Sequence, residues 1–238
     1  MPDHAILTAD AHRDLRVNTE RSAASGDAVM SAMVVPDELR QVQNEYPILF
    51  RRNLEHDRFT ALAMFGFEDG ENLFLEGTRW AARYLPLSIA IQPFLIGRPE
   101  GADTGVRQVH IDLASPRLGS EGLRIFEEDG SPSPYFHAVV EKLGMLDAGY
   151  QASIGFLAAL RRHDLLEPLS LEVPLADGST HRLVGFHVID EERLRALDPA
   201  AVAELHQAGH LMPIFMALAS LANIGALVAR KNQRLRHG

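Results

Sequence analysis

His110 and Asp112, two residues apart, are the pair best suited to metal chemistry in this sequence. Side chains alternate along a strand, so in an extended segment this imidazole and carboxylate share one face. With a distant histidine such as His187 they would supply the two histidines and one carboxylate of a non-haem iron site. Arg193 or Arg195 could then bind the carboxylate of a cosubstrate. Solvent-facing strand residues show the same pattern, so an Fe(II)- and 2-oxoglutarate-dependent oxygenase stands only as an alternative function.

A second group of residues is typical of a binding pocket rather than of catalysis. Tyrosine and tryptophan offer flat apolar area with a polar tip, which suits a peptide or an aromatic ligand. The same residues would also suit a sheet core in which neighbours satisfy the polar tips. The candidates are Tyr46, Asn72, Trp80, Tyr84 and Gln92, joined by His12 and Arg16 if the N-terminal segment packs back on them.

Composition excludes several function classes. The 23 Lys and Arg residues are outnumbered by 32 Asp and Glu residues, and a formal charge of −9 argues against nucleic acid as a partner. The chain has no cysteine, which excludes disulfides, thiolate metal ligands and a cysteine nucleophile. It also lacks the serine elbow, phosphate-loop, dinucleotide and zinc-protease motifs. We therefore expect a binding protein with no catalytic residues and no cofactor or metal.

The first half of the chain reads as strands joined by turns. We expect strands over 46–50 and 106–113, and an extended run over 87–96 that Pro93 interrupts. Apolar runs at 59–67 and 72–75 flank Asp69-Gly70, which predicts a hairpin there.

The second half reads mainly as helices around one hairpin. Apolar spacing predicts two helical segments between residues 135 and 165, and the alternating runs of 169–189 predict a hairpin around Asp177-Gly178. Asp190 and Asp198-Pro199 are expected to begin helices, and Gly209 to end one. The fold class is therefore α+β, with a mainly antiparallel sheet of hairpins from the N-terminal half packed against helices from the C-terminal half.

We expect a single domain over residues 11–230, a flexible N-terminus over 1–10 and a basic tail over 231–238. Residues 211–229 carry no charge, and we favour a buried core helix over a membrane span because Pro213 and Asn223 dilute the run. The N-terminus lacks the pattern of a secretory signal, which predicts a soluble cytoplasmic protein. The alternative location is the cell surface, reached by a route other than Sec.

Several short phrases follow one another in a recognisable order along the chain. They are residues 12–17, Glu45-Tyr46-Pro47, Phe65-Gly66-Phe67, residues 70–77, Trp80, residues 84–87, Gln92-Pro93-Phe94, Ile111-Asp112, Ile125-Phe126, Asp129-Gly130 and residues 217–221. Together they resemble the SapC family of bacterial proteins over roughly residues 11–230. The family pattern fixes the aspartate at position 112 and tolerates other residues before it, which weakens the case for His110 as a ligand.

The resemblance implies an accessory role and transfers no catalytic residues. Family members are often encoded beside flavin-dependent tryptophan-halogenase-like proteins. A soluble protein that binds a peptide or small metabolite and works with such a modifying enzyme is therefore our preferred interpretation. A homo-oligomer is compatible with the sequence, which indicates no symmetry. A surface-layer component, which the family name suggests, is a third hypothesis.

Overall fold

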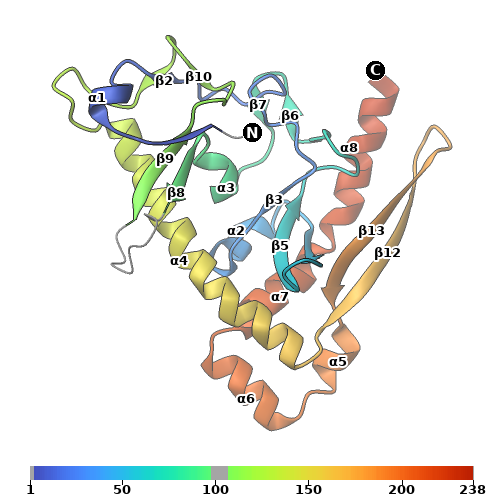
Figure 1. Cartoon of the computed structure of the whole chain (residues 1–238). Coiled ribbons are helices and arrows are strands. Elements are labelled where there is room, and N and C mark those ends of the chain that lie inside the picture. The colour runs from blue at the N-terminus through green and yellow to red at the C-terminus, as the bar shows by residue number, and fades with distance from the viewer. Residues whose placement is uncertain (1–2, 98–106, 238) are drawn as a thin grey trace. The chain divides into compact units, whose positions relative to one another are not determined.

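Two compact units, each with its own strands and helices, make up the chain (Figure 1). The computed structural model describes residues 3–97 and 107–237. The first unit comprises the described residues of Met1–Ala28, Leu75–Ala81 and Leu87–Ala148, and the second those of Val29–Phe74, Ala82–Pro86 and Gly149–Gly238. All sheet pairings given below are antiparallel, which confirms the expected α+β class.

Small sheets and the first half of a long helix build the first unit. Its sheets have the strand orders β1-β9-β8, β10-β2-β11 and β6-β7. Phe94 and Ile111 of the first sheet belong to one apolar core with Phe136 and Val139 of the helix. The elements are β1 (His4–Ile6), α1 (Ala9–His12), β2 (Arg16–Val17), β6 (Leu75–Glu76), β7 (Arg79–Trp80), α3 (Leu87–Ala90), β8 (Phe94–Gly97), β9 (Gln108–Asp112), β10 (Leu118–Gly119), β11 (Leu123–Arg124) and the start of α4 (Pro134–Arg162).

The second unit is organised around a five-stranded sheet of order β12-β13-β4-β5-β3. Two of these strands form the long hairpin of the C-terminal half, so the sheet draws on both halves of the chain rather than on the N-terminal half alone (Figure 1). The elements are β3 (Ser31–Met33), the 3-10 helix η1 (Pro36–Glu38), α2 (Leu39–Val42), β4 (Ile48–Asn53), β5 (Arg58–Met64), β12 (Leu166–Pro174), β13 (Thr180–Ile189), α5 (Glu191–Arg195), α6 (Pro199–Gln207), α7 (Leu211–Ser220) and α8 (Asn223–His237).

The expected hairpin at Asp69-Gly70 is wrong, although the chain does turn there. Strand β5 ends at Met64 because the next two amide groups, of Phe65 and Gly66, both donate to the Met30 carbonyl, at 2.7 and 3.2 Å. The hairpin partner of β5 is β4, across a polar turn in which Asn53 Oδ1 accepts from the amides of residues 55 and 56. The sequence therefore predicts the turn at Asp69-Gly70 correctly, but it predicts the wrong strand pairing.

The run expected to be extended over 87–96 is half helical. Residues Leu87–Ala90 form α3, and β8 begins only after Pro93, whose nitrogen has no hydrogen to donate to a ladder. The strand expected over 106–113 is β9, and residue 106 lies outside the described part of the chain.

The two helical segments expected between 135 and 165 are one continuous helix, α4. Gly149 lies inside it and permits close packing, since a Cβ atom at this position would come within 2.5 Å of Val35 Cγ2. The hairpin around Asp177-Gly178 is confirmed, as are the helix starts at Asp190 and Asp198, whose side chains accept from backbone amides.

Both ends of the chain contain regular structure. The first ten residues, expected to be flexible, include β1, which pairs with β9, and the start of α1. The expected basic tail continues α8, where Lys231 bonds Glu71 at 2.6 Å and also Glu68. Residues 1, 2 and 238 lie outside the described part.

The apolar C-terminal segment is buried along one face only. Within the described residues, Leu211–Arg236 is the one helical stretch long and apolar enough to cross a membrane, a test that a soluble core helix also passes. Pro213, Ile214 and Ala217 of α7 are buried, whereas Met212 and Phe215 are about half exposed. Only 28% of the most apolar 18-residue window is buried, so the segment does not have the burial expected of a core helix.

Ser220, at the end of α7, ties this helix to the sheet. Its buried hydroxyl accepts from the Ile48 amide at 2.8 Å and donates to the Ala217 carbonyl at 2.5 Å. We expect Ser220→Ala to lower the free energy of unfolding by about 1–3 kcal/mol, because the Ile48 amide would lose its partner inside the protein. Urea unfolding measures this, with Ser120→Ala on the surface as the control. Equal, negligible losses in both variants would contradict the role of Ser220.

Candidate functional site

The seven residues expected to line one pocket belong to two different units. His12, Arg16, Trp80 and Gln92 lie in the first unit, whereas Tyr46, Asn72 and Tyr84 lie in the second. Each set is therefore described with its own neighbours.

Tyr46 and Tyr84 form a buried hydrogen-bonded chain with Glu38. Tyr46 is fully buried, and its hydroxyl donates to the Tyr84 carbonyl at 2.5 Å. The Tyr84 hydroxyl donates to Glu38 Oε2 at 2.8 Å. Burial and the neighbouring Glu38 charge raise the pKa of Tyr84, so the hydroxyl stays protonated and remains a donor. This arrangement joins the end of η1 and the segment after α2 to the loop after β7, and it gives both tyrosines structural partners.

Asn72 also has backbone partners in the second unit. It is buried, its Oδ1 accepts from the Phe74 amide at 2.9 Å, and its carbonyl accepts from Arg234 at 2.8 Å. These contacts fix the loop between β5 and β6.

In the first unit, His12 and Arg16 likewise bond the backbone. His12 is buried, and its Nδ1 accepts from the Thr8 amide at 3.1 Å, while Arg16 donates to the Gly122 carbonyl at 3.3 Å. Trp80 is half-buried on β7, opposite Leu75. Of the four residues in this unit, Gln92 is the one that lines the cavity described below.

The residues expected to form the iron site are divided between the two units. His110 and Asp112 lie on β9 in the first unit, and His187 lies on β13 in the second. The His110 ring packs over Gly97, where an added Cβ would come within 2.2 Å of Nε2. The His187 ring contacts the edge of Phe59 at 4.9 Å. Among the described residues, no cluster of three His, Asp or Glu side chains could hold a metal ion, so the oxygenase alternative gains no support from the geometry.

The second unit contains an apolar groove of about 300 Å³. One wall is the edge of the sheet at β5 and the end of β3, and the other is the second half of α4. The lining residues are Met33, Val34, Arg58, Phe59, Thr60, Ala61, Tyr150, Ser153, Ile154, Leu157, Ala158 and Arg161.

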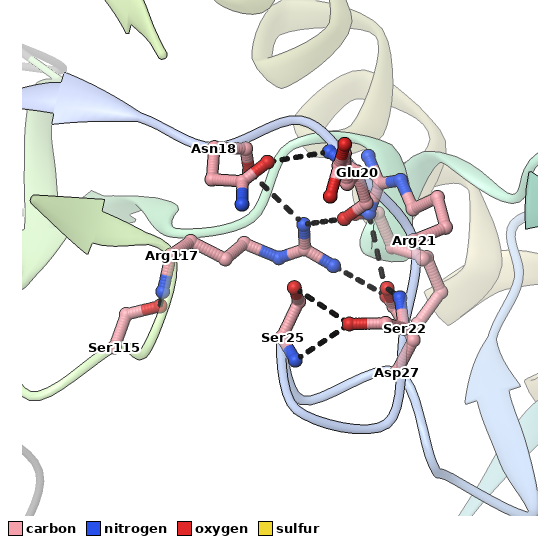
Figure 2. Close-up of polar contacts among 9 residues, drawn as sticks. Asn18, Glu20, Arg21, Ser22, Ser25, Asp27, Ser115 and Arg117 are labelled. Atoms are coloured by element: carbon pink, nitrogen blue, oxygen red, sulfur yellow. Dashed lines mark hydrogen bonds and ion pairs between the residues drawn. The ribbon is translucent and has the colours of Figure 1, made fainter. Parts of the chain in front are cut away.

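The first unit contains a smaller polar cavity of about 180 Å³ beside a buried ion pair. Figure 2 shows the Arg117 side chain reaching from the loop before β10 to the loop that carries Asp27. The Arg117 Nη2 atom lies 2.6 Å from Asp27 Oδ1, and both side chains are essentially inaccessible to solvent. Asp27 Oδ2 accepts from the Ser22 amide at 3.0 Å, and Arg21 Nη1 lies 3.4 Å from Oδ1.

A match to a known family covers most of the chain. The model of the SapC family matches residues 7–227 of the 238. The chain belongs to the SapC family. No curated protein and no solved structure matches the chain.

Sequence reasoning did not single out either cavity of this SapC-family chain. Arg117 stands between Pro116 and Leu118, and Asp27 stands in a stretch of small polar residues, where nothing in the spacing links them. Ile154 and Leu157 fit the helical pattern of residues 135–165, and that pattern does not predict a groove. For the small cavity, the sequence signal is Arg117 itself, a charged residue within a region of short strands and turns.

The Asp27–Arg117 pair is expected to be a strong determinant of stability. Asp27→Asn removes the carboxylate that pairs with the buried guanidinium, and breaking a buried pair in this way costs about 3–5 kcal/mol. Urea unfolding should show this loss in the free energy of unfolding. Asp57→Asn is the matched control, because Asp57 pairs with Arg52 and Arg161 on the surface and its loss should change stability little. Similar losses in the two variants would refute the role assigned to Asp27.

His187 is expected to make stability depend on pH. Burial, and then the nearby charge of Arg52, lower the pKa of His187 below its ordinary value of 6.5. The unfolded chain therefore binds the proton more tightly, so the contribution of His187 is complete above pH 6.5 and is lost as the pH falls through the folded pKa. A proton-NMR titration of the His187 ring in the folded protein checks this. A midpoint at or above 6.5 would rule it out.

Proposed function

We propose that this SapC-family chain is a non-catalytic accessory protein that binds an extended peptide in the groove of the second unit. The observation that carries the proposal is the position of the groove, which runs along an incomplete sheet edge and is walled by an exposed apolar helix face. One ligand could therefore form backbone hydrogen bonds with the sheet edge and pack its side chains against the helix face.

The sheet edge beside the groove is only partly covered. Strand β3 pairs with residues 62–64 of β5, and the Val34 amide extends the pairing to the Ala61 carbonyl at 3.0 Å. Residues 58–60 of β5 extend past the end of β3. Among the described residues they pair with β4 on one side and with no strand on the other. An extended peptide can add to such an edge as a further strand, and its main-chain hydrogen bonds then supply much of the affinity.

The opposite wall supplies apolar contacts. Tyr150, Ile154 and Leu157 are spaced by four and three residues along α4, so they lie on one helix face. Ile154 is 56% exposed and Tyr150 is 45% exposed, and exposed apolar side chains that cluster in this way are typical of interaction sites. Alternate side chains of an added strand would point into this wall.

The charge at one end of the groove indicates an acidic ligand group. Arg161 bonds the Asp57 carbonyl and carboxylate, both at 2.7 Å, whereas Arg58 is exposed and has no ion-pair partner among the described residues. A carboxylate on the peptide, either a side chain or the C-terminus, would complement Arg58. The proposed occupant is therefore an extended segment with alternating apolar residues and a carboxylate at one end.

The proposed partner enzyme rests on the family resemblance. A peptide held as a strand is extended and presents alternate side chains to solvent, where a modifying enzyme such as a flavin-dependent halogenase-like protein could reach them. In this proposal the chain binds the peptide in the cytoplasm and releases it to such an enzyme, which supplies the catalytic residues.

A matched pair of variants tests the groove. The probe is a fluorescein-labelled hexapeptide of alternating valine and threonine with a free C-terminal carboxylate, and fluorescence anisotropy measures its binding. Ile154→Glu should weaken binding at least about tenfold, because it places a charge on the apolar wall. Arg58→Gln should remove the preference for the free carboxylate over the C-terminal amide.

Val184→Glu is the control, since Val184 is a similarly exposed apolar residue on β13 outside the groove lining. It should leave affinity unchanged, and circular dichroism should show all variants folded. Absence of binding by the folded wild-type protein, or equal weakening by Ile154→Glu and Val184→Glu, would overturn the proposal.

A further inference from the structure

The small cavity of the first unit is rich in positive charge. Arg21, Arg117 and Lys142 all line it, and Asp27 is the carboxylate that the two arginines share. The remaining polar lining residues are Asn18, Thr19, Gln92 and Tyr135. Three cationic side chains therefore line a space of about 180 Å³, and none of its lining residues is an Asp or a Glu.

The donors of Arg117 are only partly satisfied by the protein. Its Nη1 donates to the carbonyls of Asn18 and Glu20, at 3.3 and 3.0 Å, and its Nη2 pairs with Asp27 (Figure 2). Its Nε is buried and has no hydrogen-bond partner among the residues that the structure describes. The side chain is 1% exposed, and a buried donor without a partner is costly unless something else satisfies it.

Arg21 adds a second guanidinium to the same place. Its Nη1 donates to the Ile89 carbonyl at 3.2 Å and to Asp27 at 3.4 Å. Burial lowers the pKa of Arg21, and the positive charge of Arg117 lowers it further, whereas Asp27 raises it. The single charge of Asp27 cannot balance both of them.

Two neutral donors and a further cation surround this pair. Burial raises the pKa of Tyr135, so its hydroxyl remains protonated and able to donate. The Gln92 amide lines the same cavity. Lys142, on the exposed side of α4, lies at the rim, where an ammonium can meet an incoming anion.

We propose that this cavity binds a small oxyanion, a carboxylate or phosphate group, between Arg21, Arg117 and Lys142. Such a group accepts charge-assisted hydrogen bonds from guanidinium and ammonium donors, and it balances the excess positive charge. The volume corresponds to about six water molecules at ~30 Å³ each, which fits a small metabolite or the anionic end of a larger one. The site is separate from the peptide groove, because all its residues belong to the first unit.

Calorimetry of the full-length protein with inorganic phosphate and with succinate tests the site and distinguishes the two sources of the oxyanion. At least one of them should bind with a dissociation constant below about 10 mM, and succinamide, the neutral analogue of succinate, should not bind. Lys142→Gln and Tyr135→Phe should each weaken binding about tenfold, because each removes one donor to the anion. Neither change removes a group that the ion pair of Asp27 requires.

Arg124→Gln is the matched control, since it removes one positive charge from the same unit at a residue outside the cavity lining. It should leave the affinity unchanged. Failure of both anions to bind the folded protein would overturn the proposal. So would binding that Arg124→Gln weakens as much as Lys142→Gln, since that result indicates attraction by general surface charge. Peptide binding in the groove is measured separately, so its failure would not affect this result.

Discussion

The buried charge of Arg117 is the constraint on which the first unit depends. A guanidinium removed from water must be paired and hydrogen-bonded, and Asp27 with the carbonyls of Asn18 and Glu20 supplies these partners. To do so, the N-terminal loop must fold back against the loop before β10. The same packing brings Arg21 beside Arg117. The contact between these two loops therefore stabilises the unit and also forms a cavity lined by positive side chains.

In the second unit the corresponding constraint is the sheet edge. Strand β3 covers the last residues of β5 and leaves the first ones to border a groove, while α4 presents apolar residues to the other side. Natural proteins usually protect such edges from pairing with other chains. Among the described residues this edge remains open beside exposed apolar side chains, and the proposed peptide binding rests on that arrangement.

Local signals predicted several elements well. The β12–β13 hairpin followed from Asp177-Gly178 between alternating runs, and the helix starts at Asp190 and Asp198 followed from capping chemistry. The same local reasoning failed at Asp69-Gly70, because the turn is real but hydrogen bonds to Met30 divert the chain from a hairpin. The end of β5 is thus set by hydrogen bonds to a residue more than thirty positions away, and a local sequence pattern cannot predict such a contact.

The sequence by itself determined the α+β class, the absence of thiol chemistry and, through its ordered phrases, the SapC family. It also drew attention to tyrosines that prove to be bonded within a core, because residue type shows that a polar tip needs a partner but not which partner it finds. Only the tertiary structure decided that Arg117 meets Asp27 and that Ile154 faces an open strand. Both depend on contacts between residues some ninety positions apart, which spacing along the chain cannot encode.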